Sequence, residues 1–333
     1  MRTRIDILLA VVIWGSIAAN NAAFAIEAWH PRLGELADKS ELIVVGSVLN
    51  VSNRTVHDGF NQSSTVKVSA VLKGKKDLSV LQLVDSHEPN VVCPRIVGVQ
   101  PQRSYILFLT PFDRKTNTYK PIEYRGAKLL PEDPKQHEKI FGVLRRHIAY
   151  MQSAEKASND LKEIVLDELE SETLFEVGFS TLFYAQMENQ ELLNAMKEED
   201  QIRIFEAFNG KQFWYMDWAN LTGILFHIEK RSPELIKLIA RKLSSEQNAT
   251  GPFGDPIFTG YKYFYAMCLV DASTKGDLGT GIPETGDPFD HVLKWKKYSV
   301  DQKKSIITGF FEKLDTALPG WNKSVQEGGF QDK

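Results

Sequence analysis

The histidines of the chain are the first residues to test for chemistry, because imidazole binds metal ions and transfers protons near neutral pH. A zincin-type metal site needs two histidines four residues apart on one helix, with an acid between them. No pair in this sequence has that spacing, so no such site is predicted. The seven histidines are His30, His57, His87, His137, His147, His227 and His291.

Two stretches combine histidine with acidic residues. His87 and Glu88 precede Cys93, which lies beside Pro94 in a predicted loop with no second cysteine nearby. Zinc sites draw on several clustered Cys and His ligands, so we interpret this stretch as a plain loop. The other stretch, DPFDH at residues 287–291, begins a predicted helix. Its first aspartate is accounted for as the N-cap of that helix.

A glycine-rich segment covers residues 276–286 (GDLGTGIPETG). It follows a predicted helix rather than a strand and lacks the lysine of a P-loop, so it does not predict a phosphate cradle. Asp277, Glu284 and Asp287 could offer oxygen atoms to calcium, but their spacing is not that of an EF-hand loop. A surface loop is the preferred interpretation. With no nucleophile motif either, the sequence predicts no catalytic residue, metal ion or cofactor.

Aromatic residues cluster at 213–218 (FWYMDW) and at 261–265 (YKYFY). Such rings can stack on a sugar or another flat ligand. Most of them fall on stripes with helical spacing, which is typical of a buried core. The two aromatics left over, Tyr215 and Tyr263, are the candidate ligand contacts.

The chain has two cysteines, Cys93 and Cys268. In an oxidising compartment they permit one disulfide, which would tie the first half of the chain to the second. The alternative is two separately buried thiols, since free cysteine packs like a small hydrophobe.

The spacing of apolar residues changes once along the chain. Up to about Ile122 it predicts strands at 40–51, 65–72, 78–84, 105–109 and 118–122. The first and fourth are apolar on both faces, which suits a small closed barrel. Gly46 interrupts the first strand, and we expect it at a bend or bulge, where glycine is sterically cheap.

From Pro134 onward the spacing is helical. Asp133 followed by Pro134, an N-cap residue before a proline at the first helical position, predicts a helix start. Ser232 followed by Pro233 predicts another start by the same pattern. Short connections indicate a helical bundle or stacked helix pairs, without a fixed repeat. After the first helix, further helices are predicted at 156–169, 172–187, 190–208, 212–230, 233–246, 257–271, 287–297 and 300–315.

The first 25 residues predict a secretory signal peptide. Arg2 and Arg4 precede an apolar run over residues 7–19, and Ala23-Phe24-Ala25 supplies a small-residue cleavage signal. The run is shorter than the ~20 residues that span a bilayer, so cleavage near Ala25 is favoured over a membrane anchor. We expect an exported protein, periplasmic or secreted, with no membrane span in the mature chain.

The net charge and the glycosylation sequons restrict which partners and which secretory pathway are expected. The net charge of −3 argues against nucleic acid, which needs a clustered basic face. Six Asn-x-Ser/Thr sequons matter only in a eukaryotic secretory pathway, and we favour a bacterial type of export. The sequons begin at Asn50, Asn53, Asn61, Asn220, Asn248 and Asn322.

The first domain resembles a known family. Residues 37–48 (ADKSELIVVGSV), 71–74 (VLKG) and 105–109 (YILFL) are similar, in order and spacing, to landmarks of bacterial TIMP-like (netrin-module) OB-fold domains over about residues 33–125. The resemblance implies a five-stranded Greek-key barrel. It leaves protease inhibition open, because the animal inhibitors use an amino-terminal cysteine, and the predicted mature chain begins at Ile26. The sequence 102–104 (QRS) also stands where the family usually has a glycine before the tyrosine strand.

The fold class expected is therefore α+β: an OB-like Greek-key barrel at 26–130 follows the signal peptide, and an all-α helical domain at 131–320 precedes a flexible tail at 321–333. The leading functional hypothesis is an exported, non-enzymatic interaction or binding protein with an unknown protein partner. The alternative is an enzyme or carbohydrate-binding protein with its site in the helical domain, near Trp214, Tyr263 and His291. An enzyme requires titratable groups converging in a cleft, whereas an interaction module requires an exposed apolar patch.

Overall fold

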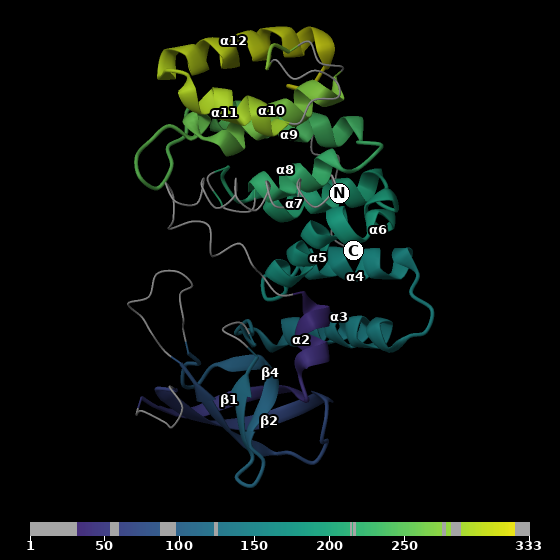
Figure 1. The fold of residues 1–333 in the computed structure, drawn as a ribbon, viewed down its shortest axis with the longest axis vertical. Coiled ribbons are helices and arrows are strands. Elements are labelled where there is room, and N and C mark those ends of the chain that lie inside the picture. Colours follow the sequence, from purple (N-terminus) through teal and green to yellow (C-terminus); the bar gives the residue numbers. More distant parts are fainter. Residues whose placement is uncertain are drawn as a thin grey trace, which may run out of the picture. The chain divides into compact units, whose positions relative to one another are not determined.

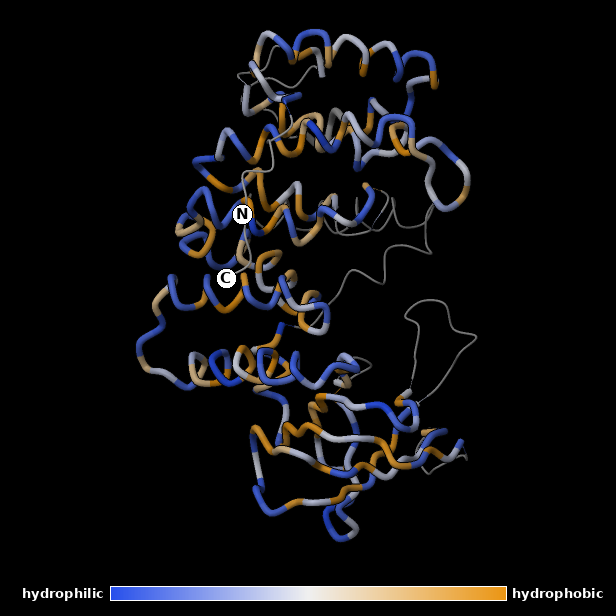
Figure 2. The backbone as a smooth tube through the Cα atoms, turned by 180° about the vertical axis from the view of Figure 1, so that it is seen from behind, coloured by the Kyte–Doolittle hydropathy of each residue, from blue (hydrophilic) through white to orange (hydrophobic). Residues whose placement is uncertain are grey.

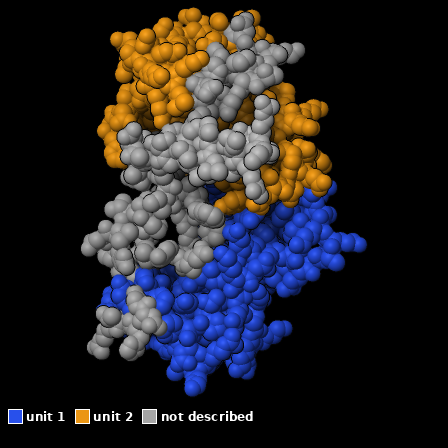
Figure 3. All heavy atoms as spheres, viewed as in Figure 1, with its two compact units in different colours: residues 1–181 blue, residues 182–333 orange. Residues whose placement is uncertain are grey.

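The structure is a computed structural model that describes residues 32–53, 60–86, 98–122, 126–213, 215, 218–274, 278–280 and 288–323. It is an α+β fold that contains a closed five-stranded barrel and a helical part, as predicted (Figure 1). The chain divides into two compact units, residues 1–181 and residues 182–333, which Figure 3 colours separately. The predicted signal peptide lies outside the described residues.

The barrel is closed by its first strand. The strand order is β1-β2-β3-β5-β4, and β1 also pairs with β4. The β3–β5 pairing is parallel and the other pairings are antiparallel. A short strand that the sequence did not predict, β6, pairs antiparallel with β4. The strands are β1 (Leu42–Ser52), β2 (Gln62–Lys73), β3 (Val80–Asp85), β4 (Ser104–Asp113), β5 (Thr118–Pro121) and β6 (Ala127–Leu129).

Both faces of β1 and β4 are buried, which explains why their sequences are apolar without alternation. Val44 and Leu107 belong to the cluster that fills the barrel. Ile43 and Ile106 belong to a second cluster, outside the barrel, that includes residues of several helices. Two of those helices are α2 (Leu33–Lys39) and α3 (Pro134–Gln152).

Gly46 lies at an irregularity of β1, as expected. The register of β1 against β2 shifts between Val45 and Gly46. A Cβ atom on Gly46 would lie 2.5 Å from Cγ1 of Val66 and 2.9 Å from the carbonyl oxygen of Lys67. Glycine is therefore required here by the close approach of β2, at the point where β1 serves both sides of the barrel.

The helix starts follow the predicted capping signals. The Asp133 side chain accepts a hydrogen bond from the Lys135 amide, and the Ser232 side chain accepts one from the Leu235 amide. The predicted helix at 190–208 is two helices, because Lys197 is an N-cap whose amide donates to Asp200. The remaining helices are α4 (Ser158–Leu169), α5 (Phe175–Glu188), α6 (Gln190–Asn194), α7 (Glu198–Asn209), α8 (Trp218–Phe226), α9 (Pro233–Glu246), η3 (Ile257–Thr259), α10 (Tyr261–Ser273), α11 (Pro288–Lys297) and α12 (Val300–Ala317).

The second unit is built around α10, which packs against α8, α9 and α11. Hydrophobic and hydrophilic residues alternate along these helices in Figure 2, as amphipathic packing requires. The predicted tail begins with packed residues, since Trp321 is buried and its carbonyl accepts a hydrogen bond from Arg241. Residues 324–333 lie outside the described part of the chain. Among the described residues, no helix is long and apolar enough to cross a membrane.

Candidate functional site

Of the two candidate ligand-contact aromatics, Tyr263 is a core residue. It has no accessible surface, and its hydroxyl donates to the carbonyl oxygen of Leu243 at 2.7 Å. Its burial in the first turn of α10 corrects the expectation that it meets a ligand. Tyr215 is half-buried, and the ammonium of Lys211 lies 4.4 Å from its ring centre. Tyr215 thus stays a candidate, already covered on one face by a cation.

The candidate disulfide stays a prediction. Cys268 is buried in α10, and burial raises the pKa of its thiol. Cys93 lies outside the described residues. So do His87, Glu88, Trp214, Asp277, Glu284 and Asp287, and nothing is described of the His291 side chain.

Among the histidines that the structure describes, His147 of α3 is the most buried. Its Nδ1 lies 2.6 Å from Oε1 of Glu168 in α4, and neither side chain is appreciably exposed. This pair joins α3 and α4 inside the first unit. In the described ranges, no group of three or more His, Cys, Asp or Glu side chains could hold a metal ion.

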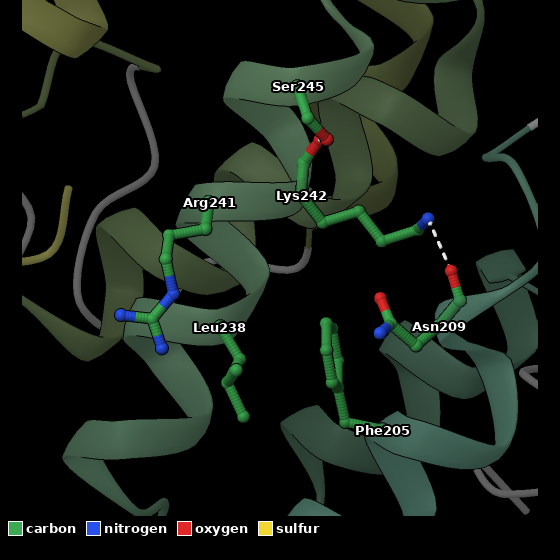
Figure 4. A pocket seen from close by; sticks show the side chains of 6 residues that line it. All are labelled: Phe205, Asn209, Leu238, Arg241, Lys242 and Ser245. Atoms are coloured by element: carbon green, nitrogen blue, oxygen red, sulfur yellow. Dashed lines mark hydrogen bonds between the residues drawn. The ribbon is translucent and has the colours of Figure 1, made fainter. Parts of the chain in front are cut away.

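An open pocket of about 390 Å³ lies between α7 and α9 (Figure 4). Its charged side chains are held by structural contacts. Lys242 donates to the carbonyl oxygen of Asn209 at 2.9 Å, and it pairs with Glu246 at 2.5 Å. Arg241 pairs with Glu234 at 2.7 Å. The pocket therefore offers no acid, base or nucleophile aimed at a common point. Its lining is Phe205, Asn209, Leu238, Arg241, Lys242 and Ser245.

A different kind of surface is formed where α10, α11 and α12 meet. Trp295 is fully buried and stacks on Phe264 of α10, with ring centres 4.3 Å apart. This contact fixes the rotation of α11, so its neighbours Leu293, Lys296 and Lys297 face outward. Lys296 reaches back to α10, where its ammonium lies 5.6 Å from the ring centre of Tyr261. Two helices thus share one exposed cation–π contact.

The connection between α11 and α12 extends this surface. Tyr298 lies 6.3 Å from Trp295, measured between ring centres, and remains 37% exposed. Val300 begins α12 and is 47% exposed, and Lys304 lies one turn further on the same helix face. We call the set the lysine–aromatic surface. It comprises Tyr261, Leu293, Lys294, Lys296, Lys297, Tyr298, Val300 and Lys304.

The lysine–aromatic surface is electropositive although the whole chain carries a net charge of −3. Four of its eight members are lysines, and Asp301 is the single acid between residues 292 and 305. Clusters of one sign on a chain of the other sign attract partners of opposite charge. The sequence signal was present in residues 294–300 (KWKKYSV), but it depends on knowing which side of α11 is buried.

Comparison with known proteins gives no relative: no family model matches the chain, and neither the curated proteins nor the solved structures include a match to it. Any functional conclusion therefore depends on the chemistry of the surfaces themselves.

Proposed function

We propose that this chain is an exported, non-enzymatic interaction protein, and that its lysine–aromatic surface docks an acidic protein partner. The observation that carries the proposal is the grouping of exposed apolar side chains with lysines at the α10–α12 junction. Tyrosine is enriched in protein interfaces because one end is apolar and the other hydrogen-bonds.

The exposures of these side chains favour a protein over a membrane. Tyr261, Tyr298 and Val300 are 41%, 37% and 47% exposed, so more than half of each is already packed against its own unit. Binding to a lipid surface requires apolar groups that enter the bilayer by ~5–10 Å. Side chains that are largely packed against their own unit suit a protein partner. Such a partner can present a complementary shape and can place carboxylates opposite the lysines.

The alternative, an enzyme or carbohydrate-binding protein with its site in the helical part, has less support. Tyr263 is buried, and the charged groups of the α7–α9 pocket are occupied by Glu234, Glu246 and a backbone carbonyl. The pocket would have to break these contacts before its cations could meet a substrate.

The barrel and the export route belong to the same proposal. The strand order β1-β2-β3-β5-β4, closed by β1–β4 and with β3 parallel to β5, supports an OB-like Greek-key barrel of the TIMP-like type. Barrels of this kind bind many unrelated partners, so the topology does not name one. The amino-terminal sequence supports export by a cleaved signal peptide.

The test is affinity capture from the exporting compartment with matched variants. The double variant Lys296→Glu/Lys297→Glu reverses two charges of the surface, and Tyr298→Ala removes an apolar contact. We expect the captured partner to be acidic and to bind the double variant at least tenfold more weakly, equivalent to about 1.4 kcal/mol. The control is the double variant Lys75→Glu/Lys76→Glu, which reverses two exposed charges in a turn of the barrel and should leave binding unchanged.

Three outcomes would contradict the proposal. One is equal capture by the wild type and the double variant. Another is Lys296-dependent binding to vesicles containing phosphatidylserine, with no protein captured. The third is a bound small molecule with no protein partner, which would favour the alternative function.

A further inference from the structure

One end of the barrel interior is polar. Along β2 the inward positions run from Val66 to Ser64 and Gln62, and Ser64 and Gln62 pair with Leu83 and Asp85 of β3. Side chains of directly paired residues lie on the same face of a sheet. Gln62, Ser64 and Asp85 therefore follow one another at the end of the apolar barrel core.

Two oxygen atoms of these side chains are buried without a hydrogen-bond partner. Gln62 is 3% exposed and Ser64 is 2% exposed. The Gln62 amide group donates to Oδ1 of Asn53, but its Oε1 accepts no hydrogen bond, and neither does Oγ of Ser64. Buried polar atoms of folded proteins almost always have a partner, so an unpartnered pair needs an explanation.

Asp85 adds a carboxylate to the same end of the barrel. Its Oδ1 accepts a hydrogen bond from the Ser86 amide at 2.8 Å, and burial raises its pKa to about 6. Tyr105 of β4 interacts electrostatically with this carboxylate. Burial raises the pKa of Tyr105, and the charge of Asp85 adds to that rise. The Tyr105 hydroxyl oxygen accepts a hydrogen bond from the Gln100 amide, which fixes it at this end.

We propose that Asp85, Gln62 and Ser64 form a binding site for a small hard cation, of which Ca²⁺ is the representative. The three groups offer a carboxylate, an amide carbonyl and a hydroxyl oxygen, which are ligand types that Ca²⁺ accepts, with water completing its six to eight oxygens. This site is independent of the lysine–aromatic surface, and it lies in the other unit.

A cation explains the set better than a water molecule alone. Water can donate to Gln62 and Ser64, but it leaves the desolvated charge of Asp85 uncompensated. A cation satisfies all three groups together and favours the ionised carboxylate. A site with one carboxylate is weak, with a dissociation constant of about 10⁻⁴–10⁻³ M expected, as in extracellular calcium modules. The sequence predicted no metal site because these residues meet only through the β2–β3 register.

The experiment measures unfolding of the purified protein at pH 8, in EDTA and in 10 mM Ca²⁺. With a dissociation constant of about 1 mM, 10 mM Ca²⁺ lowers the unfolding equilibrium constant about elevenfold. We expect Asp85→Asn to abolish that effect. We expect Ser64→Ala to keep the fold, since it deletes an unpartnered buried hydroxyl, and to reduce the calcium effect.

The matched control is Asp77→Asn, which removes an exposed carboxylate from the same barrel and should retain the full calcium effect. Methylammonium chloride at the same concentration tests an organic cation. The proposal is overturned if 10 mM Ca²⁺ does not stabilise the wild type, or if it stabilises Asp85→Asn and Ser64→Ala as much as the wild type. Asp85-dependent stabilisation by methylammonium but not by Ca²⁺ would also overturn it.

Discussion

Replacing Asp85 by asparagine should stabilise the metal-free protein, and only above the pH at which the carboxyl ionises. Asp85 has an ordinary pKa of 3.8 and a folded-state pKa of about 6, raised by burial. In the folded state the carboxyl therefore holds its proton to a higher pH than in the unfolded chain. Its favourable contribution is complete below pH 3.8 and is lost as the pH rises to about 6.

The size of the effect follows from the shift. The difference between about 6 and 3.8 is about 2.2 pKa units. At 1.36 kcal/mol per unit it corresponds to about 3 kcal/mol. Asparagine keeps an oxygen for the Ser86 amide but carries no charge, so it escapes this penalty. In EDTA we expect Asp85→Asn to be up to about 3 kcal/mol more stable than the wild type at pH 8, and about equal to it at pH 3.5.

Urea denaturation followed by circular dichroism measures this difference, with the wild type and the variant compared at pH 3.5, 6 and 8. Within the described residues, the titratable group coupled to Asp85 is the Tyr105 hydroxyl, and burial raises its pKa further above this range. A gain that is the same at every pH would show that the carboxylate is not desolvated. A loss of stability at pH 8 in EDTA would refute the reasoning, and with it the view that Asp85 lacks a compensating partner.

Two further substitutions test the framework around the site. In thermal unfolding, Gly46→Val should destabilise the barrel by ~3 kcal/mol or more, because the valine side chain would overlap Val66 and the Lys67 backbone. The control Gly142→Ala, on the open face of α3, should be neutral or stabilising in that assay. Glu168→Ala should cost about 3–5 kcal/mol in urea denaturation because it leaves His147 buried without its partner, whereas Glu170→Ala removes a surface ion pair with Lys139 and should cost ~1 kcal/mol or less. A Glu168→Ala variant as stable as Glu170→Ala would contradict the importance of the buried pair.

Local patterns in the sequence predict much of this fold. The doubly apolar strands around Ile43 and Ile106, the glycine at position 46 and the cap at Asp133 each depend on neighbouring residues alone. The structure places all of them as the physical argument requires. The break at Lys197 was missed because Asp200 caps it from inside an apparently continuous apolar pattern.

The candidate sites depend on contacts that the sequence does not display. Asp85 reaches Gln62 through a strand pairing that spans 23 positions, and Lys296 reaches Tyr261 across two helices. The aromatic clusters misled for a related reason: Tyr263 hydrogen-bonds inward to Leu243, so spacing alone assigned it to the wrong side of α10. Burial on a helix is decided by its neighbours, and those neighbours are distant in sequence.

The double pairing of β1 has a consequence for the order of events during folding. Its pairing with β2 joins Ile43 to Lys73, whereas its pairing with β4 joins Leu42 to Leu109. The first contact forms within a hairpin, but the second must wait for more than twice the length of chain, and distant contacts form slowly. Until β4 pairs with it, one edge of β1, a strand that is apolar on both faces, is open to other chains. A chain emerging from a ribosome or a translocation pore would pass through that state every time, so the rate of β4 docking sets how long it is exposed to aggregation.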